Sequence, residues 1–92
     1  MRLRSLLFVP GDRPERMEKA LALGADALIL DLEDSVAPAN KGAAREHVAT
    51  FLERTERGGP KLFVRLNPLD SDYFVDDLAG VLGSFPDGLV LP

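Results

Sequence analysis

Three carboxylate side chains, Asp31, Glu33 and Asp34, stand within four consecutive residues, directly after a short apolar run. Carboxylates at this spacing repel one another, and a cation relieves the repulsion, either a divalent metal ion or an arginine. Oxygen ligands would favour Mg²⁺ or Ca²⁺ over zinc. Alternatively, Asp34 or Ser35 only begins a turn and Glu33 is solvated. We favour the functional interpretation, because ligands of parallel α/β proteins bind where strands end.

Arg65 stands at the end of another apolar run, residues 62–66. An arginine in an apolar strand costs free energy to bury unless an anion pairs with it. Its planar fork suits a substrate carboxylate and equally suits Asp31 or Glu33. A substrate clamp and an internal salt bridge therefore both stay open, and they do not exclude each other. The position at a strand end favours the clamp.

A third candidate is the segment 8–16, where a strand is expected to pass through a tight turn into a helix. The free N–H groups at a helix start attract anions, and Arg13, Arg16 and Lys19 add positive charge nearby. On spacing alone, a solvated helix face is the better interpretation. The only histidine, His47, lies in a helical stretch and is predicted to be at the surface. The sequence contains no Ser-His-Asp arrangement and no phosphate-binding loop.

Four nearly continuous apolar runs predict strands that are covered on both faces, as in a parallel sheet. They comprise residues 6–9, 27–30, 62–66 and 88–91. Helical patterns lie between the runs. The first helix is predicted to open at Asp12, with Glu15 completing a capping box and Gly24 as the residue after its end.

The second predicted helix carries one apolar stripe and stops before Gly58; the stripe is Ala44, Val48, Phe51 and Leu52. The third has Asp70 or Ser71 as its N-cap and Gly83 after its end, with an apolar stripe of Phe74, Leu78, Val81 and Leu82. The alternation of strand and helix contains no linker. It predicts parallel strands joined by helical crossovers.

This order fits a doubly wound open sheet or a (β/α)₈ barrel. The turn after the first strand, residues 10–12, is not a GxGxxG fingerprint, so a dinucleotide-binding unit is disfavoured. We expect an α/β fold with a parallel sheet, the N-terminal portion of a TIM (β/α)₈ barrel with about four strands and three helices. Because such a barrel needs about 250 residues, residues 1–92 are expected to be a single partial domain of a longer protein.

The amino-acid composition disfavours several classes of binding partner. The net charge is −4 and the basic residues are scattered, which disfavours nucleic acid and anionic membranes. No cysteine is present, so disulfides, thiolate metal sites and a cysteine nucleophile are excluded. No apolar run approaches the roughly 20 residues of a membrane span. We therefore expect a cytoplasmic protein.

Four motifs together resemble the citrate lyase beta subunit family. They are residues 4–12 (RSLLFVPGD), 30–36 (LDLEDSV), 64–68 (VRLNP) and 87–92 (DGLVLP). That family belongs with malyl-CoA and citramalyl-CoA lyases in the HpcH/HpaI aldolase superfamily. The match extends along the chain in the right order and spacing.

The resemblance implies a Mg²⁺-dependent carbon–carbon lyase on a TIM barrel. Its substrate would be a 3-hydroxyacyl thioester of CoA or of an acyl carrier, and its products an acetyl thioester and a 2-oxo acid. Arg65 matches the catalytic arginine that grips the substrate near the metal, and Phe8 and Lys19 match positions on the CoA-binding side. Asp31, Glu33 and Asp34 resemble the acidic loop that orders the water molecules of the metal.

The family's direct metal ligands, a Glu and an Asp on later strands, are not in this chain. Glu15 stands where relatives can carry a CoA-contacting lysine. Two alternatives keep the fold: an aldolase acting on a free 2-oxo acid, and a truncated barrel module without catalysis. The assembly is expected to be a homo-oligomer, a trimer or hexamer.

Overall fold

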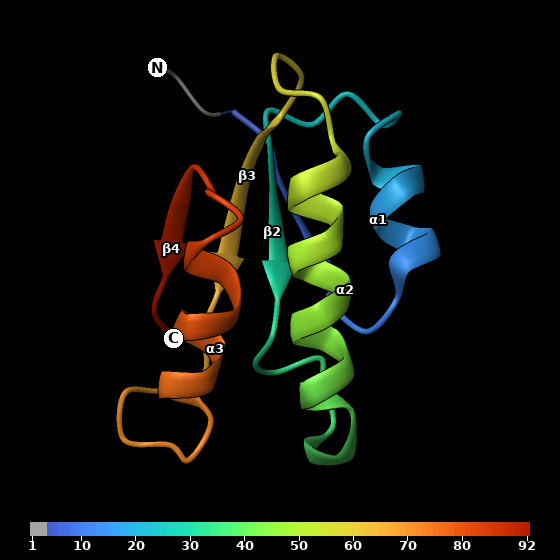
Figure 1. Ribbon diagram of the computed structural model, residues 1–92. Coiled ribbons are helices and arrows are strands. Elements are labelled where there is room, and N and C mark those ends of the chain that lie inside the picture. Colours follow the sequence, from blue (N-terminus) through green and yellow to red (C-terminus); the bar gives the residue numbers. More distant parts are fainter. Residues whose placement is uncertain (1–3) are drawn as a thin grey trace.

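The computed structural model describes residues 4–92 as a layer of four parallel strands covered by three helices (Figure 1). In chain order the elements are β1 (Leu6–Pro10), α1 (Pro14–Ala20), β2 (Ala27–Asp31), the 3₁₀ turn η1 (Pro38–Asn40), α2 (Lys41–Arg54), β3 (Lys61–Arg65), α3 (Phe74–Leu82) and β4 (Gly88–Val90). The strands follow one another across the sheet in sequence order. This confirms the predicted parallel α/β fold, with strand ends within two residues of those expected.

The core lies between the sheet and the helices, because alternate side chains of each strand point toward the helical layer. The predicted stripe of α2 is buried there in full. The completely or almost completely buried apolar side chains of this layer include Met17, Leu28, Leu30, Val48, Phe51, Leu62, Val64 and Val81. The third helix departs from its predicted stripe at Leu82, which is 52% exposed.

Coverage differs between the two faces of the sheet. All three helices pack on one face, and no helix described for residues 4–92 covers the other (Figure 1). The edge strand β1 therefore leaves Leu6 and Phe8 about half exposed, whereas every residue of β2 is buried. The prediction that the strands are covered on both faces is thus met in β2 alone.

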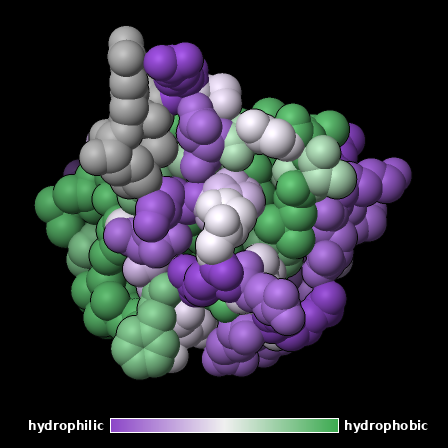
Figure 2. Space-filling view, turned by 90° about the horizontal axis from the view of Figure 1, so that it is seen from above, coloured by the Kyte–Doolittle hydropathy of each residue, from purple (hydrophilic) through white to green (hydrophobic). Residues whose placement is uncertain are grey.

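Exposed apolar side chains gather at the two flanks of the molecule. Seen from the amino ends of the strands, hydrophilic residues occupy much of the centre and the right edge, and hydrophobic residues gather on the left and in a patch right of the centre (Figure 2). The exposed large apolar side chains of α3, β4 and the residues next to them are Val75, Leu82, Phe85, Leu89 and Leu91, and those of β1 and the end of α1 are Leu6, Phe8 and Leu23.

The register brings the carboxyl ends of all four strands to one level. Pro10 pairs with Asp31, Asp31 with Arg65, and Arg65 with Val90. Two of the predicted site residues are therefore direct neighbours on adjacent strands. Since side chains two residues apart share a face, Phe8 lies on the same face as Pro10, one step before the carboxyl end of β1.

Aspartates at the amino ends of β2 and β4 hold each strand to a neighbour. The Asp26 carboxylate accepts hydrogen bonds from the backbone N–H groups of Arg4 and Ser5, at 2.7 and 3.0 Å. These donors lower the pKa of Asp26. In the same way, Asp87 accepts a 2.7 Å hydrogen bond from the N–H of Leu62 in β3. These contacts secure the register at the end of the sheet opposite the predicted site.

The predicted capping box of the first helix is wrong. Helix α1 begins at Pro14 with Arg13 as its N-cap, and no side chain caps it. The preceding turn is set by the N–H of Gly11, which donates to the carbonyl of Asp31 at 2.8 Å. Asp12 instead accepts a long 3.4 Å hydrogen bond from Asn40. Tertiary contacts therefore override the local capping pattern.

The other predicted helix boundaries need similar corrections. Helix α1 ends at Ala20, and Gly24 lies beyond a further turn at a φ of 77°. Tyr73 is the N-cap of α3, and neither Asp70 nor Ser71 caps it. The Ser71 hydroxyl is used elsewhere, donating to the carbonyl of Pro68 at 2.7 Å. Gly83 follows α3 as predicted.

Gly11 is expected to be intolerant of a side chain. A Cβ there would lie 2.7 Å from the carbonyl oxygen of Asp31 and 2.9 Å from Cγ2 of Val48. Gly11→Ala should lower the free energy of unfolding by about 1–3 kcal/mol, since neither neighbour can move without disturbing the core. Denaturant unfolding measures the change.

Gly42→Ala is the matched control, because a Cβ at Gly42 in α2 meets nothing within 4 Å. It should be neutral or stabilising by up to about 1 kcal/mol. Equal effects of the two substitutions would contradict the packing role of Gly11.

Candidate active site

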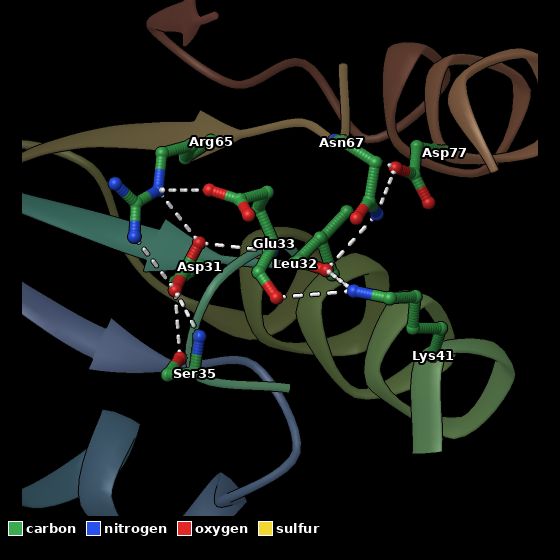
Figure 3. A network of polar contacts seen from close by, with 8 residues as sticks. All are labelled: Asp31, Leu32, Glu33, Ser35, Lys41, Arg65, Asn67 and Asp77. Carbon is green, nitrogen blue, oxygen red and sulfur yellow. Dashed lines mark hydrogen bonds and ion pairs between the residues drawn. The ribbon is translucent and has the colours of Figure 1, made fainter. Parts of the chain in front are cut away.

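Asp31 and Arg65 form a bidentate ion pair at the carboxyl ends of β2 and β3 (Figure 3). Arg65 donates from Nε to Oδ1 of Asp31 at 2.8 Å and from Nη2 to Oδ2 at 3.0 Å. Asp31 is 1% exposed, whereas the Arg65 side chain is 22% exposed. The internal salt bridge considered for Arg65 is therefore present. Within the acidic cluster, Arg65 neutralises Asp31.

The Asp31 carboxylate also organises the loop that follows it. It accepts hydrogen bonds from the N–H of Glu33 at 2.9 Å, the N–H of Ser35 at 2.9 Å and the Ser35 hydroxyl at 2.7 Å. Burial by itself raises the pKa of Asp31, but the hydrogen bonds from Arg65, Ser35 and Glu33 outweigh it and hold the pKa far below its usual range. Asp31 is thus charged at neutral pH and acts as a structural acceptor, and all its lone pairs are occupied.

The other two acidic residues lie around this pair. An oxygen of Glu33 is 4.0 Å from Nε of Arg65. Asp34 is exposed at the rim. Asp31 in the first place, with Glu33 and Asp34 further away, raises the pKa of Arg65. Within residues 4–92, no group of three side chains is arranged to hold a metal ion.

Phe8 completes the surroundings of Arg65. The guanidinium lies over the Phe8 ring, 4.8 Å from its centre, which is a cation–π contact. A hollow of about 390 Å³ opens beside them, lined by Phe8, Pro10, Arg16, Asp31, Asp34, Ser35 and Arg65. Within the described chain, Nη1 of Arg65 makes no hydrogen bond.

Lys19 lies outside that hollow. It lines a neighbouring, mainly apolar hollow of about 230 Å³ along β1 and α1, together with Leu7, Phe8, Val9, Pro10, Arg16, Ala20 and Leu23. Phe8, Pro10 and Arg16 line both spaces. Phe8 therefore contacts Arg65 directly, whereas Lys19 lines only the neighbouring hollow. His47 is exposed, as predicted.

A second polar network binds the acidic loop from the side of the helices. The buried ammonium of Lys41 donates to the carbonyls of Leu32 and Glu33, each at 3.0 Å. Asn67 donates to the same Leu32 carbonyl at 3.0 Å and to Asp77 at 2.6 Å. Asp77 is completely buried and also pairs with Arg45 at 2.8 Å.

These supporting residues escaped the sequence analysis. Asn67 follows Arg65 in a motif already singled out, and its place just after a strand was the available signal. Asp77 sits at helical spacing from Phe74 and Val81, so its burial could have been inferred from the apolar stripe. Lys41 gave no signal, because a lysine at a helix start is ordinarily solvated.

A family model described as HpcH/HpaI aldolase/citrate lyase matches residues 4–92. The chain belongs to this family. Its resemblance to the citrate lyase beta subunit and malyl-CoA lyases is thereby confirmed. The chain is 40% identical over 89 residues to a (3S)-malyl-CoA thioesterase of Cereibacter sphaeroides. It is 36% identical to the citrate lyase subunit beta of Leuconostoc mesenteroides.

These alignments cover 97% of the chain but only 31% and 30% of the two relatives, so the chain spans about a third of their length. Solved structures agree. CitE of Mycobacterium tuberculosis, in complex with magnesium, acetoacetate and coenzyme A, superposes with a TM-score of 0.82 at 37% identity. That match covers 98% of this chain and 32% of CitE. RipC of Yersinia pestis gives a TM-score of 0.70 at 34% identity, covering 99% of this chain and 34% of its own.

Among the described residues, no helix is long and apolar enough to cross a membrane.

The depressed pKa of Asp31 predicts a pH-dependent contribution to stability. A carboxylate whose pKa is lower in the folded state stabilises the fold above its unfolded pKa of about 4, and this stabilisation is lost as the pH falls further. Asp31→Asn should therefore cost roughly 2–3 kcal/mol near pH 7, and less below pH 4. Urea unfolding at several pH values measures the difference between the two proteins.

Asp70→Asn serves as the control, since Asp70 is exposed. Its effect on the free energy of unfolding should be small at every pH. A cost of Asp31→Asn that stays constant from neutral pH to pH 2 would show that the ion pair does not carry this stability.

Proposed function

We propose that this chain forms part of a Mg²⁺-dependent carbon–carbon lyase that cleaves a 3-hydroxyacyl thioester into an acetyl thioester and a 2-oxo acid. One observation carries the proposal. Asp31 binds two nitrogens of Arg65, Nη1 makes no hydrogen bond within the described chain, and Arg65 lines an open hollow at the carboxyl ends of the strands. Family membership and the CitE complex with magnesium, acetoacetate and coenzyme A support it.

Arg65 binds and orients the oxo-acid end of the substrate in this proposal. Its position is set by Asp31 on one side and the Phe8 ring on another, so little side-chain entropy is lost on binding. Nη1 would donate to a substrate carboxylate. Because two hydrogen bonds to Asp31 fix the guanidinium, its orientation is set before the substrate arrives.

The bond broken joins the carbinol carbon to the α-carbon of the thioester. The hydroxyl group loses its proton and becomes the carbonyl of the 2-oxo acid, while the electron pair passes to the α-carbon, which takes up a proton to give the acetyl thioester. Arg65 would hold the carboxylate of the oxo-acid end in place while the bond breaks. None of the residues of this chain is assigned as the base or the acid.

The acidic loop fits a place beside the metal ion. Asp31 has no free lone pair for a ligand bond, so it holds Arg65 and does not bind metal. Asp34 lines the hollow and Glu33 lies 4.0 Å from Nε of Arg65; both would hydrogen-bond water molecules on the ion. When bound, Mg²⁺ supplies electrophilic polarisation of the substrate oxygens. Its direct ligands would come from later strands of a (β/α)₈ barrel, of which this chain would be the first part.

Phe8 and Lys19 would line the approach of the thioester arm. The hollow they share is mainly apolar, and Arg16 and Lys19 are its basic lining residues, which suits an uncharged arm ending in an anionic group. An acyl-CoA is the proposed substrate form. The complete protein is proposed to be a cytoplasmic homo-oligomer.

Product analysis tests the reaction. The full-length protein is incubated with malyl-, citramalyl- and citryl-CoA and Mg²⁺, and with the corresponding free acids. A 2-oxo acid formed from a thioester shows lyase activity, and formation from a free acid alone would favour the aldolase alternative. Release of CoA with an intact hydroxy acid would show thioester hydrolysis instead.

Arg65→Lys should lower kcat/KM by about tenfold or more, because a single ammonium cannot bind Asp31 through two bonds and still reach the substrate. Steady-state kinetics of the full-length enzyme measures the change. Arg54→Lys is the control: Arg54 pairs with Glu18 on the outer helices and should leave kcat/KM unchanged. Unaltered kinetics of Arg65→Lys would reject the clamp.

Asp34→Asn should raise the Mg²⁺ concentration needed for half-maximal rate by several-fold to roughly tenfold, because an amide holds metal-bound water less well than a carboxylate. A Mg²⁺ titration at saturating substrate measures this. Asp76→Asn, an exposed aspartate in the first turn of α3, is the control. Superimposable titrations of the wild type and Asp34→Asn would remove Asp34 from the metal site.

A further inference from the structure

Lys41 is the one buried lysine among the described residues, and no carboxylate neutralises it. Its side chain is 7% exposed and its ammonium donates only to the main-chain carbonyls of Leu32 and Glu33. The Tyr73 ring lies 5.2 Å away on another side. Burying an ammonium without an ionic partner costs free energy. The two carbonyls and the ring around Lys41 therefore indicate a role other than packing.

The carbonyls it binds belong to the acidic loop. Figure 3 shows Lys41 and Asn67 converging on Leu32 from α2 and from the end of β3, while Asp31, Arg65 and Ser35 hold the other side of the loop. The backbone of residues 31–35 is thus bound from both sides. Because the Lys41 ammonium binds carbonyl oxygens, it does not pair with the carboxylates of Glu33 and Asp34. These carboxylates can therefore bind other groups at the carboxyl ends of the strands.

We infer that Lys41 is a positioning residue for the proposed lyase: it fixes the backbone at Glu33 so that the Glu33 and Asp34 carboxylates face the place where the metal's water molecules would lie. The inference rests on the proposed function. Asn67 shares the task through Leu32, and Asp77 orients Asn67 by accepting from its backbone and side-chain nitrogens at 2.9 and 2.6 Å.

Two effects of Lys41 on a nearby cation oppose each other, which makes the test decisive. Its positive charge repels Mg²⁺, so a purely electrostatic role predicts tighter metal binding when the charge is removed. A positioning role predicts weaker binding. Lys41→Met removes both charge and donors, whereas Lys41→Gln removes the charge and keeps an N–H donor.

The experiment measures Mg²⁺ affinity of the full-length protein by calorimetry, without substrate. Lys41→Met should weaken Mg²⁺ binding roughly tenfold or more, in the range found when groups orienting metal ligands are lost. Lys41→Gln should weaken it less. Lys61→Met is the matched control, since Lys61 is an exposed lysine at the opposite end of β3. Unchanged or tighter binding by folded Lys41→Met would overturn the inference.

Hydrogen–deuterium exchange provides a readout that needs neither metal nor activity. The amides of Glu33 and Ser35 both donate to Asp31, and exchange in a peptide covering residues 31–36 should become faster in Lys41→Met while residues 27–30 stay protected. If Lys41→Met does not fold, the same two measurements on Lys41→Gln decide. Unaltered exchange of residues 31–36 would also overturn the inference.

The outcomes separate this inference from the proposed function. A wild type that binds Mg²⁺ but yields no 2-oxo acid rejects the lyase, and Lys41 is then judged by the affinity and exchange results. A wild type that binds no Mg²⁺ also rejects the lyase, and exchange alone decides the role of Lys41. Lyase activity with unchanged metal affinity in Lys41→Met rejects only the positioning role.

Discussion

The ion pair between Asp31 and Arg65 is the interaction on which the candidate site depends. Each residue alone would be unfavourable at the end of a buried strand, because an unpaired charge there loses its hydration. Together they satisfy each other through two hydrogen bonds, and the remaining lone pairs of Asp31 bind the loop that follows. The Asp31 carboxylate therefore orients the Arg65 guanidinium, fixes the backbone of the acidic loop and neutralises the arginine charge.

The pair is possible only because of the register of the sheet. Asp31 and Arg65 are opposite each other in adjacent parallel strands, and Gly11 allows the end of β1 to approach the Asp31 carbonyl closely. Support from the helical side comes through Lys41, Asn67 and Asp77. Backbone geometry places the two charges together, and the buried polar network binds the backbone of the loop that follows Asp31.

Much of this was predictable from sequence. Continuous apolar runs located all four strands, because burial dominates the choice of strand residues, and the strand-end rule put Arg65 and the acidic cluster on one rim. The predicted caps were wrong: Asp12 and Ser71 have the right residue types, but the Asp12 carboxylate binds the distant Asn40 and the Ser71 hydroxyl binds the nearby Pro68 carbonyl. Lys41 could not have been found, since its partners are main-chain carbonyls, which leave no trace in side-chain patterns. Arg65 was open to two interpretations, and the structure shows the salt bridge while the clamp remains a proposal.

The order of the strands across the sheet has a consequence for how the chain is built. Each strand pairs with the one synthesised just before it, and Asp26 and Asp87 each bind the main chain of that preceding strand or of the residues leading into it. No strand has to wait for a distant partner, so loop-closure entropy stays small at every step. This order allows the sheet to grow from β1 outward as the polypeptide is synthesised, and Asp26 and Asp87 hold β2 and β4 to the preceding strand.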